Sequence, residues 1–384
     1  MNSGSEQVAG DPVPAAGTVR VERGTCFALF AYDVGLAIDL DEAQRRITAL
    51  AQRASICHKR RAPRYFEYQP PPLRVTQTVE PVRICGFETA ATVDSVIYDF
   101  GAVSVTYTIP LTVPLADLAG LSDELYDNEA LLAASRRGVA ALLDTIGPAV
   151  RKPQVADLVE DYTIFEIDAL SSPWTTEDVI ARHGPLLARI LRAESAALSR
   201  QEIDDALACQ LSFSTSDCAV IDWNAAFLFD ADADDVRAVL EFANVELLEM
   251  RYLDDRLDAA LDQAYAAMTK RAGGRYRVLG SKAEDLWRIA ELQMDSAELF
   301  EGVTNALKLL GDQYLARVYR LTAQRFHLSD WDASIRRKLS TMESIYEKIS
   351  DRQANWRVEV LEWIIIILIA VEIVLMLCES LWKG

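Results

Sequence analysis

The sequence predicts an α+β protein with two diverged strand–helix–strand–strand–helix units, a long coiled-coil-like helical hairpin and one C-terminal transmembrane helix. Three observations predict it. The order of strand and helix patterns restarts after Gly147-Pro148, a heptad spacing follows later in the chain, and an apolar run comes last. We therefore expect a disordered lead-in at 1–23, the two units at 24–150 and 151–272, the hairpin stalk at 281–357 and the anchor at 358–382.

Composition indicates a globular body. Hydrophobic residues make up 51% and charged residues 25% of the 384 residues, which is typical of folded chains. The formal net charge of −19 disfavours generic binding to nucleic acid, because such a surface repels phosphate groups. The six cysteines form no CxxC pair, which argues against a zinc ribbon and suits a reducing compartment.

The first unit begins with an apolar, aromatic run that predicts a strand, followed by a helix with an apolar stripe. Two further strands and a second helix follow, and Gly147-Pro148 ends that helix. The predicted segments are Thr25 to Ile38, Asp39 to Arg53, the two strands within Val82 to Ile109, and Leu115 to Ile146.

The second unit repeats this order, and the segments that start at Tyr98 and Ile221 share an apolar–Asp–aromatic–small pattern. This predicts a duplication, whose two copies should superpose. The predicted elements are Leu158 to Leu170, Thr175 to Glu194, Leu207 to Phe213, Ala219 to Phe229 and the long helix Asp232 to Arg271.

The stalk carries a heptad series whose steps alternate between four and three residues, as in the seam of a coiled coil. Its positions are Ile335, Leu339, Met342, Tyr346, Ile349, Gln353, Trp356, Val360 and Trp363. We expect an antiparallel hairpin whose second arm continues into the anchor, and a homo-oligomer held by this seam.

The anchor is aliphatic from Trp363 to Cys378 except for Glu372. Trp363 and Trp382 bracket it about 28 Å apart, close to the thickness of a bilayer core. Glu372 costs roughly 2.5–3.5 kcal/mol, whereas each aliphatic residue returns about 0.3–0.6 kcal/mol, so insertion into the lipid bilayer still wins. The alternative is a buried helix of a soluble oligomer. The predicted oligomer and membrane interface is Glu372, Trp363, Trp382, Trp356, Ile349 and Tyr346.

Location follows from the flanking charges. Arg352 and Arg357 precede the run and only Lys383 follows it, which places the body in the cytoplasm. The first twenty residues carry acids and no apolar core, so they predict no signal peptide. We expect a single-pass protein of the inner (plasma) membrane.

Catalytic and nucleotide-binding motifs are absent from the sequence, and we expect no enzyme activity, cofactor or metal. An enzyme that uses acids such as Asp222, Glu249 and Asp254 is the less favoured alternative.

Two stretches could dock a partner. The basic and aromatic stretch His58 to Pro72 could contact RNA or a ribosome through Lys59, Arg60, Arg61 and Arg64, or be a solvated connection. The helical segment Phe242 to Asp258 could present Glu249, Arg251, Asp254 and Asp255 as a docking face, or be an amphipathic helix laced with ion pairs.

The segment Leu361 to Leu375 has an LEW start, an isoleucine run and an internal acid, at Leu361, Glu362, Trp363 and Glu372. Together with Ala219 to Asp230 and Glu241 to Asp258, it resembles the "required for meiotic nuclear division" family of bacteria and mitochondria. The resemblance covers roughly Asp161 to Cys378, but the LDTPDFFW-like motif of eukaryotic members is missing, and Leu286 to Phe300 occupies its place.

The resemblance implies an integral membrane protein with its body on the matrix or cytoplasmic side and no known catalytic activity. Its mitochondrial members are tied to translation near the inner membrane. We therefore expect a membrane-anchored cytoplasmic scaffold, with an RNA- or ribosome-tethering adaptor as the alternative.

Overall fold

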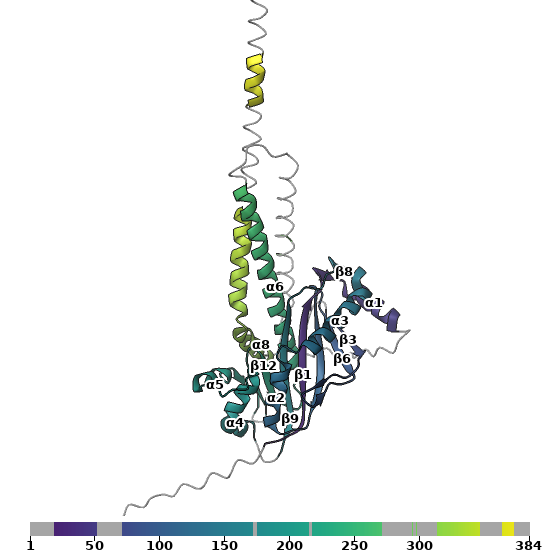
Figure 1. The fold of residues 1–384 in the computed structure, drawn as a ribbon, viewed down its shortest axis with the longest axis vertical. Helices are drawn as coiled ribbons and strands as arrows, with labels where there is room; N and C mark the ends of the chain where they lie inside the picture. Colours follow the sequence, from purple (N-terminus) through teal and green to yellow (C-terminus); the bar gives the residue numbers. More distant parts are fainter. Residues whose placement is uncertain are drawn as a thin grey trace, which may run out of the picture.

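The computed structural model describes residues 19–51, 71–171, 175–214, 217–270, 294, 297, 313–345 and 363–371. Its centre is one mixed eight-stranded sheet with the order β10-β11-β12-β9-β1-β7-β6-β3 (Figure 1). The strands are β1 (Val21–Asp33), β3 (Leu73–Thr78), β6 (Thr92–Ile97), β7 (Ala102–Leu111), β9 (Val159–Leu170), β10 (Gln210–Leu211), β11 (Cys218–Ile221) and β12 (Ala225–Phe229). The α+β class is confirmed, and the two predicted units share a single sheet.

The helices are α1 (Leu40–Ala51), α2 (Leu118–Leu125), α3 (Glu129–Ile146), α4 (Thr176–Leu191), α5 (Arg200–Ala206), α6 (Asp234–Lys270) and α8 (Gln313–Arg325). Residues 328–345 and 363–371 are also helical. Two short strand pairs lie outside the large sheet, β2 (Ala37–Ile38) with β8 (Val150–Arg151) and β4 (Arg83–Ile84) with β5 (Phe87–Glu88). The predicted helix from Leu115 to Ile146 is broken at Tyr126 to Asn128, because Asp127 has φ +52° and the Asn128 side chain caps α3.

Strand β1 is buried on both faces, which explains its continuous apolar sequence. Cys26, Ala28 and Phe30 pack into the core under α1 to α4. Phe27 and Leu29 point to the other face, where α6 and α8 cover the sheet. The body is thus a three-layer sandwich with the sheet between two helical layers (Figure 1).

The two halves of the sheet have the same strand order from the centre outwards but different strand directions. β7 is antiparallel to β1, whereas β12 is parallel to β9. The sheet pairings therefore make β3 antiparallel to β1, so the chain enters β3 at the end where β1 finishes. β10 runs parallel to β9, so α4 and α5 return the chain along the sheet. The prediction of two superposable copies is wrong in strand direction.

Helix α6 is about 55 Å long at 1.5 Å per residue and rises past the sheet (Figure 1). Residues 328–345 pack along it, with Ile335 and Met342 fully buried and Leu339 partly buried. Tyr319 donates to Glu246 at 2.7 Å, and further along Lys338 pairs with Asp254 at 2.8 Å.

The predicted stalk did not include α6, which packs against it here. Ser334 contacts Asp254 and Lys338 also pairs with Asp258, so the residue numbers rise together and 328–345 runs parallel to α6. Within the described residues the second arm of the predicted hairpin packs along α6, and its antiparallel pairing with the first arm stays a prediction. Most of the predicted first arm lies outside the described residues. The first three seam positions, from Ile335 to Met342, are filled by the chain's own α6.

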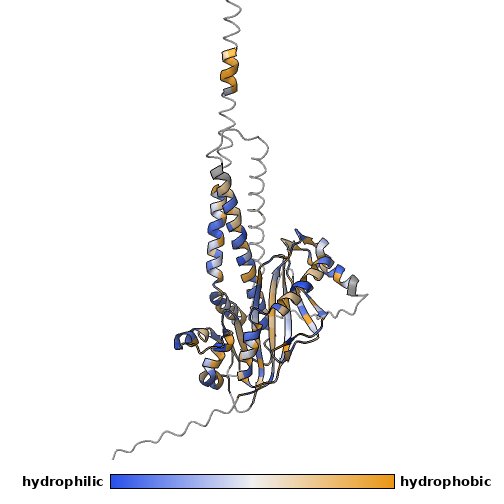
Figure 2. Ribbon diagram, in the orientation of Figure 1, coloured by the Kyte–Doolittle hydropathy of each residue, from blue (hydrophilic) through white to orange (hydrophobic). Residues whose placement is uncertain are grey.

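The last described helix is exposed and apolar throughout. All nine residues of 363–371 are exposed, from Trp363 at 64% to Val371 at 50% (Figure 2). Among the helices that the structure describes, none is both long and apolar enough for a membrane crossing. The predicted transmembrane helix is therefore not found there. The remaining interface residues, Tyr346, Ile349, Trp356, Glu372 and Trp382, lie outside the described residues.

Candidate functional site

A polar cavity lies where the central strand β1 ends. The chain turns directly after Asp33, and backbone hydrogen bonds fix the turn: Val34 N–H donates to Gly101 O, and Leu36 N–H donates to Arg151 O, both at 2.9 Å. Gly101 has φ +102°, and a Cβ on it would lie 1.8 Å from the carbonyl oxygen of Gly35. Only glycine allows this close approach of two backbone segments.

The cavity has a volume of about 320 Å³ and takes its lining from three parts of the chain. The β1 turn supplies Asp33, Gly35 and Leu36, the segment after β8 supplies Lys152 and Gln154, and α6 supplies Tyr252 and Arg256. Glu249, Tyr252 and Arg256 are spaced by three and four residues, so α6 carries all three on one face. Side chains of both charges therefore converge at one end of the sheet.

Two carboxyl groups of this site are buried. Asp33 is 3% exposed and Glu249 is 1% exposed. Burial raises the pKa of Asp33 to about 7, against the opposing effect of the Arg256 guanidinium. Burial also raises the pKa of Glu249 well above its usual value, and the Asp33 carboxyl raises it further. Within the described part of the chain, neither Glu249 oxygen has a hydrogen-bond partner. The pair can therefore hold a proton near neutral pH.

The four residues of the predicted docking face have different surroundings. Glu249 is inside the protein, and Arg251 pairs with Glu160 of β9 at 2.5 Å. Asp254 pairs with Lys338 at 2.8 Å, and Asp255 is exposed. Arg251 and Asp254 thus join α6 to other parts of its own chain. Glu249 is buried and therefore cannot be part of an exposed docking face, and Arg251 and Asp254 already have partners within the chain. A docking role for the exposed part of this helix stays a prediction.

Asp222 belongs to a separate ion cluster. It is fully buried in the β11–β12 turn, receives a hydrogen bond from Arg192 Nε at 3.0 Å and another from Arg325 Nε at 2.7 Å. Both arginines also bind Asp205, and their hydrogen bonds lower the pKa of that carboxyl to about 2. The cluster fastens α8 to the sheet. The structure therefore does not bring Asp222, Glu249 and Asp254 together as one acidic centre.

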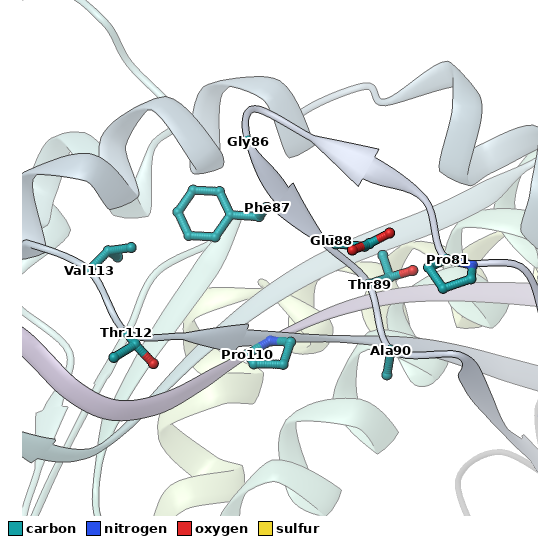
Figure 3. A pocket seen from close by; sticks show the side chains of 9 residues that line it. All are labelled: Pro81, Gly86, Phe87, Glu88, Thr89, Ala90, Pro110, Thr112 and Val113. Atoms are coloured by element: carbon teal, nitrogen blue, oxygen red, sulfur yellow. The ribbon is translucent and has the colours of Figure 1, made fainter.

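A second cavity of about 570 Å³ lies between the β4–β5 hairpin and the end of β7 (Figure 3). Phe87 points toward Val113 across it, and Pro81 and Pro110 also belong to its lining. Glu88 is the one ionisable side chain among the lining residues. This groove offers fewer groups for chemistry than the cavity at Asp33.

Of the predicted site residues, Lys59, Arg60, Arg61 and Arg64 lie outside the described residues. In the described ranges, no group of three or more His, Cys, Asp or Glu side chains is placed to hold a metal ion. Sequence reasoning missed Asp33. The sequence indicates this residue only weakly, because Asp33 is a single acid near the end of an apolar run.

The fold and the cavity define an α+β protein with a three-layer body and a helical stalk. The chain belongs to the family described as "Uncharacterized protein MJ0711, N-terminal domain", whose model matches residues 23–235. It is similar to the uncharacterized protein MJ0711 of Methanocaldococcus jannaschii, with 24% identity over 242 residues, 62% of this chain and 72% of the relative. No solved structure matches the chain significantly.

The family match corrects the expected relationship. The resemblance to the "required for meiotic nuclear division" family is wrong, because the matching family model is that of MJ0711 and covers 23–235. The resemblance relied heavily on 361–375, where aliphatic composition alone makes unrelated sequences look alike. The expected link to translation, which came from that family, is withdrawn.

Proposed function

We propose that the protein is a membrane-attached scaffold, whose body stands at the cytoplasmic face of the membrane on a helical stalk. The observation that carries this proposal is the exposed helix 363–371. Ile367 is 57% exposed and Leu368 is 62% exposed, whereas the body buries most of its large apolar side chains. Full burial of a large apolar side chain contributes about 1.5–3 kcal/mol, so this helix has a strong tendency to leave water.

The sequence around this helix supports lipid as the environment that it enters. The aliphatic pattern continues to Cys378, and Trp382 stands at its far end. Arg352 and Arg357 lie before the apolar run, which favours a cytoplasmic body in a single-pass protein of the inner membrane.

Self-association is the second part of the proposal. Because α6 fills the seam up to Met342, contacts between copies would use the later positions Tyr346, Ile349 and Trp356. Glu372 would face a neighbouring copy, where a partner reduces the cost of its burial. Glu372→Leu should then leave membrane insertion intact and change the oligomer size in detergent. Unchanged assembly would contradict this role of Glu372.

Flotation of the full chain with liposomes tests the attachment. The variant Ile366→Arg with Ile369→Arg places two charges in the apolar helix, each costing about 2.5–3.5 kcal/mol in a membrane. We expect the wild type to float with the lipid and this variant to remain at the bottom. The matched control, Tyr126→Arg with Phe213→Arg, adds the same charge at exposed aromatic positions of the body and should float. Equal flotation of both variants would contradict the proposal.

A further inference from the structure

The cavity at Asp33 presents two cations to its interior. Arg256 comes from α6 and Lys152 from the segment after β8, and both belong to its lining. The Arg256 guanidinium lies 5.6 Å from the centre of the Tyr252 ring, which places the ring beside it. A planar guanidinium recognises the oxygens of a phosphate, sulfate or carboxylate group, and an ammonium group adds a second positive charge.

The acids of the site do not cancel this charge near neutral pH. Burial raises the pKa of Asp33 to about 7 and that of Glu249 well above its usual value. Four groups face the pair or line its cavity. They are Arg256 and Tyr252 from α6, Lys152 from the segment after β8, and the Gly35 backbone N–H. With at least one proton on the pair, at most one of these two carboxyl groups is charged, beside the cations Arg256 and Lys152 of the lining. This positive charge repels a metal cation and attracts an anion.

A protonated carboxyl adds a donor to the cavity. A carboxylic acid that burial keeps neutral can donate a hydrogen bond to an oxyanion, whereas its ionised form repels the anion. Gln154 and Tyr252 add an amide and a hydroxyl to the same lining. The volume of about 320 Å³ suits a small molecule.

We propose that this cavity binds a small oxyanion between Arg256 and Lys152, and that the Asp33–Glu249 pair takes up a proton when the anion binds. The recognised chemistry is a tetrahedral or planar group of anionic oxygens. The proposal is independent of membrane attachment, because every group that it uses lies in the body or on α6.

Isothermal titration calorimetry of the full chain in mild detergent tests it, with sodium sulfate as the probe. Sulfate does not titrate between pH 6 and pH 8, so any pH dependence belongs to the protein. We expect saturable binding at pH 6 and an affinity about tenfold weaker at pH 8, as a single group with a pKa of about 7 gives. Titrations at pH 7.5 in two buffers of different ionisation enthalpy should show proton uptake, because a group with a pKa of about 7 is mostly deprotonated there before the anion binds. Sodium chloride at equal ionic strength should give no saturable signal.

Four variants separate the parts of the proposal. Arg256→Gln should abolish binding at every pH, and Lys152→Gln should weaken it at least tenfold. Asp33→Asn keeps a donor in place, so it should bind sulfate at pH 8 as tightly as at pH 6. The matched control is Arg251→Gln, which removes a cation of the same helix that pairs with Glu160. It should bind like the wild type.

Thermal melts establish that each variant is folded before it is titrated. The proposal is overturned if the folded wild type shows no saturable sulfate binding at pH 6. It is also overturned if Arg256→Gln and Lys152→Gln both bind normally, or if Asp33→Asn keeps the pH dependence of the wild type.

Discussion

Asp33, the last residue of β1, and Glu249, near the middle of α6, are two buried carboxyl groups, and the Asp33 carboxyl raises the pKa of Glu249. Arg256 on the same helix lowers the pKa of both. The layer of α6 and the central strand of the sheet thus meet at a site whose charge depends on pH. Buried groups of this kind are costly for stability, and they are common at binding sites.

The first prediction concerns pH and stability. The folded-state pKa of Asp33 is raised from 3.8 to about 7, so the folded protein holds a proton that the unfolded chain releases. The free energy of unfolding should therefore fall as the pH rises from about 4 to about 7. Glu249→Gln removes the second such group and should flatten this fall. At pH 8 the variant should be more stable by about 1–3 kcal/mol.

Chemical denaturation at pH 5, 6.5 and 8 measures this effect. Glu124→Gln, at an exposed glutamate of α2, is the control and should follow the wild-type pH profile. If Glu249→Gln were less stable than the wild type at pH 8, the buried Glu249 carboxylate would be a stabilising group, which contradicts the prediction.

The second prediction tests the turn beside the cavity. Gly101→Ala places a Cβ against the Gly35 carbonyl at a φ of +102°, so it should cost about 3 kcal/mol or more. Gly138→Ala is the matched control, because Gly138 lies inside α3 with open space where its Cβ would be. It should raise stability by about 0.5–1 kcal/mol. Thermal unfolding measures both changes in stability. If both substitutions raised stability, or both lowered it, the turn geometry would be refuted.

The third prediction concerns the ion cluster at Asp222. Arg325→Met leaves this fully buried carboxylate with Arg192 as its remaining arginine, and should cost about 3 kcal/mol. Arg200→Met removes an exposed pair with Asp204 and should change stability by less than about 1 kcal/mol. Denaturant titration measures the free energy of unfolding of both variants. Equal losses of stability would mean that the cluster does not hold α8 against the sheet.

The fourth prediction concerns the stalk. Met342 is fully buried against α6, so Met342→Ala should cost about 2–5 kcal/mol of local stability. Hydrogen exchange should speed up in 328–345 and in the facing part of α6, while the sheet keeps its protection. Arg336→Ala, at a largely exposed position of the same helix, should leave exchange in both helices unchanged. Faster exchange in the sheet alone would contradict the packing.

Periodicity was enough to predict many of the elements. The continuous apolar run from Thr25 to Ile38 predicted a strand, and β1 covers most of it. The helix expected from Asp232 to Arg271 is observed as α6, Asp234–Lys270. Leu207 to Phe213 gave only the two-residue β10, and β3 (Leu73–Thr78) lies outside the strands that the sequence predicted.

The topology and the site depended on information that periodicity does not contain. Strand direction depends on where each connection re-enters the sheet, and the similar patterns at Tyr98 and Ile221 say nothing about that. The heptad spacing from Ile335 to Met342 specifies a helical partner but does not say which helix fills the seam. A signal for Glu249 was present, because it shares the apolar stripe of Phe242 and Val245. Glu249 was expected among the charged residues of this amphipathic helix, but it lies with the buried apolar residues.

Alkaline carbonate extraction of membranes from cells that produce the full chain tests the central claim most directly. A helix inserted in lipid resists this treatment, whereas a protein held by surface contacts is released. We predict that the intact protein remains in the membrane pellet, and that the variant Ile366→Arg with Ile369→Arg moves to the supernatant. Release of the intact wild-type chain into the supernatant would contradict the proposed attachment.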